Sequence, residues 1–113
     1  MATRSSITIK ELDGTVKSIY CHWDGYPEGV GKVLNEHYTE LDKVRELIAL
    51  GNLSSLGPEI GVKHDFEDRN YSMCLAYGRD RGDANQEARC WVNGQDYNYT
   101  FNVKTGRWTC RRG

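Results

Sequence analysis

Residues 20–31 read Tyr-Cys-His-Trp-Asp-Gly-Tyr-Pro-Glu-Gly-Val-Gly and are the densest run of special residues in the chain. The run holds three aromatic residues, a histidine, a proline and three glycines. Glycine costs backbone entropy in regular structure, and Trp and Tyr need partners for their polar atoms. This stretch therefore predicts a corner at which a strand runs into a glycine-rich helix start, a favourable place for a binding site.

The residues before the corner predict a β-hairpin. Strands are expected over residues 6–10 and 15–22, with a tight-turn signal at Asp13-Gly14. A two-residue turn would place Lys10 opposite Lys17, and like charges directly opposite each other destabilise a pair of strands. A longer loop is therefore the alternative.

The residues after the corner predict two helices. Pro27 suits the first position of a helix, and apolar residues from Val30 to Tyr38 follow at helical spacing. Thr39 is the expected N-cap of the second helix, and Gly51 ends it. Glycines weaken the first helical turn, so their presence predicts the close approach of a ligand or of another backbone.

The second half of the chain predicts further strands. They are expected over residues 71–77, 89–92, 97–103 and 107–110, and residues 97–103 alternate most clearly between apolar and polar side chains. Residues 79–83 are expected to form a charged loop. The chain is thus predicted to be a single domain over residues 1–113 of class α+β. Its sheet would be mostly antiparallel, an N-terminal hairpin plus a C-terminal meander, with two helices packed on one face.

Composition narrows the classes of partner. The chain has 113 residues and a formal net charge of −1, and its basic tail is short, which argues against a duplex nucleic acid partner. No apolar run reaches the length of a membrane span, and the N-terminus lacks the apolar core of a signal peptide. We therefore expect a cytoplasmic protein without a membrane partner, whose four cysteines are free and mostly buried thiols.

The corner supplies the first candidate ligand-binding residues. Trp23 or Tyr26 would stack on a planar group, while backbone N–H groups near the glycines would meet an anion. The structural alternative is a strand end with a buried Trp, a tight turn and a capping or core histidine. The candidates are His22, Trp23, Asp24, Tyr26, Gly29 and Gly31.

The second candidate is the charged segment with Arg79, Asp80 and Arg81. Two arginines beside a glycine can bind phosphate or carboxylate, and an acid between them can orient a guanidinium or contact ribose hydroxyls. The structural alternative is a solvated loop with local ion pairs that contribute little.

Metal-binding and catalytic patterns are weaker. The acidic cluster formed by His64, Asp65, Glu67 and Asp68 lacks an EF-hand spacing, so neither a metal nor a cofactor is expected. His22 and Asp24 lie two residues apart and permit an acid–base pair, but no third catalytic group is evident. The protein is therefore expected to bind rather than to catalyse, with a small hydrolase as an alternative.

Residues 20–31 resemble a signature of small proteins of unknown function that tailed bacteriophages and prophages encode. The later segment Gly78-Arg79-Asp80-Arg81-Gly82 resembles their second signature. The resemblance implies a phage accessory protein acting in the host bacterial cytoplasm, where small phage proteins often counter host defence. It carries no catalytic residue over to this chain.

Two modes of action fit such a protein without catalytic machinery. The expected mode is a sponge that sequesters a small nucleotide-like signal, with Trp23 and Tyr26 on the base, Arg79 and Arg81 on phosphate, and Asp80 or Asp24 on hydroxyls. The alternative is an inhibitor that binds a host defence nuclease, as anti-CRISPR proteins do. A sheet with few strands leaves an open edge, so a homo-oligomer is a further possibility.

Overall fold

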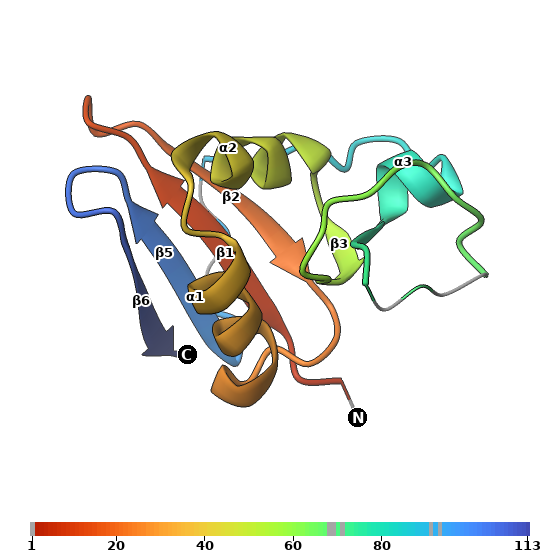
Figure 1. The fold of residues 1–113 in the computed structure, drawn as a ribbon, viewed down its shortest axis with the longest axis horizontal. Helices are drawn as coiled ribbons and strands as arrows, with labels where there is room; N and C mark the ends of the chain where they lie inside the picture. Colours follow the sequence, from red (N-terminus) through yellow and green to blue (C-terminus); the bar gives the residue numbers. More distant parts are fainter. Residues whose placement is uncertain (1, 68–69, 71, 91, 93) are drawn as a thin grey trace.

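The predicted hairpin is the centre of a six-stranded sheet in the computed structural model, which describes residues 2–67, 70, 72–90, 92 and 94–113 (Figure 1). Strands β1 (Ser5–Lys10) and β2 (Val16–Cys21) pair antiparallel, with Ile7 opposite Ile19. Lys10 lies opposite Val16 rather than Lys17. The longer loop predicted from charge repulsion is therefore confirmed.

The remaining strands are divided between the two edges of the sheet. Strands β3 (Leu53–Ser55) and β4 (Leu75–Ala76) extend it beyond β2, and β5 (Tyr97–Asn102) and β6 (Arg107–Arg112) extend it beyond β1. The β1–β5 and β2–β3 pairs are parallel and the other three are antiparallel, so the sheet is mixed. The α+β class is confirmed.

The predicted C-terminal meander is corrected in one respect: β4 and β5 follow each other in sequence but lie on opposite sides of the central hairpin. β3 already occupies the free side of β2, so the chain returns to pair β5 with the free side of β1. A short helix and a long connection separate β4 from β5, which gives the chain the length to cross the sheet.

Two helices cover one face of the sheet, as predicted (Figure 1). A π-helical turn, η1 (Pro27–Gly31), leads directly into α1 (Lys32–His37), and α2 (Leu41–Leu50) follows. The N-cap of α2 is Glu40 rather than Thr39, and no side chain among the described residues caps the helix. Gly51 ends the helix at φ 87°, where a residue with a Cβ would be strained.

The core lies between these helices and the sheet. It includes the alternating residues Ile7 and Ile9 of β1 and Tyr99 and Phe101 of β5. The apolar side of the alternating stretch 97–103 thus packs into the core. The opposite face is polar: Thr8 Oγ1 lies 2.7 Å from Ser18 Oγ.

The region around the second motif departs most from expectation. Residues 77–81 form a short helix, α3 (Tyr77–Arg81), where a strand end and a charged loop were predicted. The strand predicted over residues 71–77 is reduced to β4, and its first residue lies outside the described ones. The strand predicted over residues 89–92 is represented by a bridge between Arg89 and Ser18, while residue 91 is not described.

Candidate functional site

The glycines of the corner are accounted for by close contacts within the protein. A Cβ on Gly29 would overlap the backbone oxygen of Asp24, and one on Gly31 would lie 3.2 Å from the ring of Tyr99. A Cβ on Gly25 would lie 2.8 Å from the backbone oxygen of Thr3. The sequence predicted that either a ligand or another part of the chain approaches these glycines closely. The structure shows the close approach of other parts of the chain.

Hydrogen bonds tie this corner to β5 and to the helix start. The Tyr99 hydroxyl donates to the backbone oxygen of Gly25 at 2.7 Å, in a buried position. The Val30 amide donates to the oxygen of Asp24 at 2.8 Å, and Asp24 adopts φ 57° to make this turn. The corner therefore connects the end of β2 to η1 and holds both against β5.

The other corner candidates stay partly accessible. The Tyr20 hydroxyl lies 2.7 Å from His22 Nδ1, and the rings of His22 and Trp23 meet edge to face at 4.7 Å. The Tyr26 hydroxyl donates to Asp24 Oδ1 at 3.2 Å, and this bond raises the pKa of Tyr26. His22 and Asp24 thus each have a tyrosine partner, which gives no support to an acid–base pair between them.

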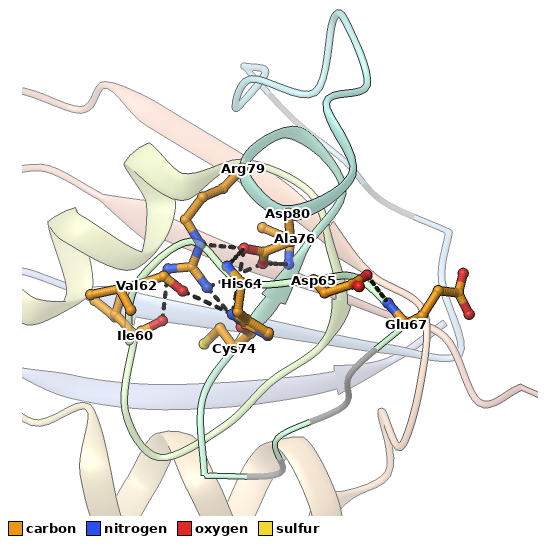
Figure 2. Close-up of polar contacts among 9 residues, drawn as sticks. All are labelled: Ile60, Val62, His64, Asp65, Glu67, Cys74, Ala76, Arg79 and Asp80. Carbon is orange, nitrogen blue, oxygen red and sulfur yellow. Dashed lines mark hydrogen bonds and ion pairs between the residues drawn. The ribbon is translucent and has the colours of Figure 1, made fainter.

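Arg79, a candidate for phosphate binding, is directed into the protein (Figure 2). Its Nη1 donates to the backbone oxygen of Ile60 and its Nη2 to that of Cys74, both at 2.8 Å. Its Nε donates to Asp80 Oδ1 at 2.9 Å. The guanidinium therefore joins α3, β4 and the loop around Ile60, and all three of its nitrogens have protein partners.

Asp80 is the acceptor at the centre of the same network (Figure 2). Its fully buried side chain also accepts hydrogen bonds from the amides of Ala76 and His64, at 2.8 and 3.2 Å. Burial acts to raise its pKa, but the hydrogen bonds from Arg79 and these amides outweigh burial and hold the pKa below its usual range. Such a carboxylate is not available for ribose hydroxyls.

Arg81 is the exposed member of the second motif. Its guanidinium binds Asp83 through contacts of 2.6–3.1 Å and lies 4.8 and 4.7 Å from the ring centres of Phe66 and Tyr77. Of the predicted phosphate ligands, Arg81 is thus the accessible one, and it already has an acidic partner. A pocket shared by the two motifs stays a prediction.

A surface that was not among the predicted sites lies along β6 at the edge of the sheet. Residues 97–113 hold four of the 15 basic residues of the chain and none of its 16 acidic residues. Arg107, Arg111 and Arg112, here called the basic edge, are exposed, and within the described residues neither Arg107 nor Arg111 takes part in an ion pair. The basic tail was visible in the sequence, but its position on an open strand was not.

Hollows flank the basic edge on both faces of the sheet. On the face opposite the helices, a hollow of about 620 Å³ is lined by Lys10, Thr100 and Arg111 among others, and none of the described residues that line it is acidic. On the helix side, a smaller hollow of about 180 Å³ lies between Pro27, Trp108 and Cys110. The exposed backbone of β6, its arginines and the two hollows therefore lie together at one edge of the sheet.

Comparisons with protein-family models, curated proteins and solved structures return no match for this chain. The resemblance to phage proteins accordingly stays a prediction. Within the described residues, no helix is long and apolar enough to cross a membrane, and no three His, Cys, Asp or Glu side chains gather as a metal site. Asp68, in the predicted acidic cluster, is not among those residues.

Proposed function

We propose that this chain is a non-catalytic binding protein that docks on a protein partner through the basic edge of β6. The observation that carries the proposal is that the charged side chains of the second motif bind within the protein, whereas those of the basic edge face solvent. Arg79 and Asp80 are committed to internal contacts, whereas Arg107 and Arg111 are exposed without an ion-pair partner among the described residues. Arginine is enriched at the centres of protein interfaces, where it supplies several directed donors.

The biological setting of the proposal comes from the phage resemblance. A phage accessory protein that binds and blocks a host defence protein, such as a nuclease, needs an interface and no catalytic group. The inward-facing Arg79 favours this mode over a nucleotide sponge, because the sponge hypothesis placed Arg79 on phosphate. Asp80, one of the two acids offered for the hydroxyls, is also hydrogen-bonded within the protein.

The test is a pair of charge reversals that change the net charge equally. Arg107→Glu with Arg111→Glu alters the basic edge, and Lys17→Glu with Lys63→Glu alters exposed lysines elsewhere. Expressed in a bacterium that carries a defence system, the native chain and the lysine variant should restore plating of a sensitive phage. The arginine variant should not restore it.

Equal restoration by both variants would contradict docking through the basic edge. Calorimetry with cyclic nucleotides and ADP-ribose derivatives separates the two modes. Tight binding of any of them would assign the protein to nucleotide sequestration instead.

A further inference from the structure

The alternation of hydrogen bonds along β5 and β6 identifies the backbone groups that the open edge presents. The Tyr97 amide donates to Arg4 and the Val103 amide to Lys10, so the odd-numbered residues of β5 face β1. The Gly113 amide donates to Asp96, so the odd-numbered residues of β6 face β5. Because neighbouring residues of a strand point their backbone groups in opposite directions, the even-numbered residues of β6 face away from the sheet.

The outward groups are the amides and carbonyls of Trp108, Cys110 and Arg112. The sheet order places no described strand beyond β6. β6 is six residues long, enough to pair with another strand over its whole length. A row of backbone groups that have no partner within the described part of the chain is a template for the addition of a strand.

The side chains of β6 specify what kind of strand would fit. Arg107 and Arg111 lie on the face opposite the helices, so an added strand should present acidic residues there. On the helix side, the hollow beside Trp108 and Cys110 has room for an apolar side chain. Because side chains alternate between faces, the matching segment alternates acidic and apolar residues.

Two other occupants fit this edge less well. A second copy would bring two basic edges together with no acidic residue in either strand. Pairing antiparallel about Thr109 sets Arg107 of each chain opposite Arg111 of the other, and pairing about Cys110 sets the two Arg111 residues diagonally opposite, so like charges meet in both registers. Single-stranded nucleic acid needs exposed aromatic rings. Here the Trp108 indole donates to the backbone oxygen of Tyr38 at 2.8 Å, and Arg112 covers the ring of Tyr97.

We propose that β6 binds an extended segment of the partner, alternating in acidic and apolar residues, as a seventh strand of the sheet. This inference rests on the proposed function and names the chemistry of the partner at the same edge. The backbone of β6 supplies the affinity, the arginines select the acidic face, and the hollow by Trp108 receives an apolar side chain.

The test uses a seven-residue peptide of alternating Glu and Val with blocked ends, titrated into the intact chain and followed by NMR. Amide hydrogen exchange should slow at Trp108, Cys110 and Arg112 when the peptide binds. A Lys–Val peptide of the same pattern should not bind. Two further peptides carry N-methyl groups, one on all Glu amides and the other on all Val amides. One of the two should bind at least about tenfold more weakly, and the other should keep the affinity of the unmethylated peptide.

A variant of the protein gives an independent check. Cys110→Pro removes an outward amide without removing a ladder bond, and proline is tolerated in edge strands at such positions. Its NMR spectrum should show the native fold, and peptide affinity should fall about tenfold. Should the variant unfold, the N-methylated peptides still decide the question.

Strand addition would be overturned if both N-methylated peptides bound as well as the unmethylated one, or if binding left the amides of Trp108, Cys110 and Arg112 unprotected. It would also be overturned if self-association protected these amides without peptide, or if an oligothymidylate bound more tightly than the Glu–Val peptide. If strand addition fails while Arg107→Glu with Arg111→Glu still abolishes the biological effect, the proposed function stands with another geometry. If both fail, the basic edge is not the interface.

Discussion

Arg79 Nε lies 2.9 Å from Oδ1 of Asp80, its neighbour in sequence, and the two side chains together join three segments of the chain. The arginine reaches the loop around Ile60 and Cys74, the residue before β4. The aspartate accepts hydrogen bonds from the backbone amides of His64 and Ala76. Two residues of the segment that resembles a ligand-binding signature, Arg79 and Asp80, thus link parts of the protein to one another in this fold.

The first prediction concerns the loss of Arg79. Arg79→Ala should lower the free energy of unfolding by about 3–5 kcal/mol, because it leaves the buried Asp80 without its counter-charge. Arg79→Lys should not restore stability, because an ammonium cannot reproduce the separate donors of the guanidinium. Urea unfolding measures both. Arg81→Ala is the control and should lower stability by less than Arg79→Ala does, since its ion pair with Asp83 and its contacts with the rings of Phe66 and Tyr77 are exposed at the guanidinium. Equal losses at both positions would contradict the assignment.

The second prediction concerns acid. Since folding lowers the pKa of Asp80, its contribution to stability is full above the ordinary value of 3.8. It should be lost as the pH falls from there through the lower pKa of the folded state. Asp80→Asn should flatten that part of a plot of unfolding free energy against pH. A plot for Asp80→Asn that keeps the native loss of stability at low pH would argue against this role.

The third prediction concerns the glycines of the corner. Gly29→Ala should cost about 1–3 kcal/mol or more, because its Cβ would meet the backbone of Asp24 rather than a flexible side chain. Gly78→Ala is a matched control in α3, where the nearest atom to a new Cβ is 3.6 Å away. It should be neutral or slightly stabilising. Thermal unfolding that shows similar losses for the two variants would contradict this account.

The fourth prediction concerns the bond that closes the corner onto β5. Tyr99→Phe removes a buried hydroxyl and leaves the oxygen of Gly25 without its donor. The expected loss is about 1–3 kcal/mol, the usual result of leaving a buried acceptor unpaired. Tyr26→Phe removes an exposed hydroxyl and serves as control. Chemical denaturation of the two variants in parallel is the measurement.

The elements that follow from local pattern were predictable. Residues 97–103 alternate so regularly that β5 and its buried Tyr99 and Phe101 could be expected, and repulsion between Lys10 and Lys17 indicated the longer hairpin loop. Gly51 was correctly expected to end α2, because glycine adopts a positive φ, here 87°, without the strain that a Cβ would bring.

The features that depend on distant contacts were not predictable. Whether Arg79 faces a ligand or the backbone of Ile60 depends on a loop about twenty residues earlier, and no local spacing encodes that approach. The parallel pairing of β1 with β5 likewise joins segments far apart in sequence, so the basic tail gave no sign that it forms an open edge.

The fifth prediction separates the four thiols by reactivity. Cys21 is buried, and burial raises its pKa to about 12, so its reactive thiolate is scarce at neutral pH. Burial also raises the pKa of Cys74, which lies 3.3 Å from the Tyr38 hydroxyl. Cys90 and Cys110 are exposed, contrary to the expectation of mostly buried thiols.

Iodoacetamide at neutral pH should therefore label Cys90 and Cys110 in the folded protein, and all four cysteines in denaturant. Peptide mass spectrometry of the digested protein reads out each position. Because Cys110 belongs to the strand that carries the basic edge, its rapid labelling would show that this strand is accessible in solution. Protection of Cys110 in the native chain, with Cys90 labelled, would mean that the edge of β6 is covered.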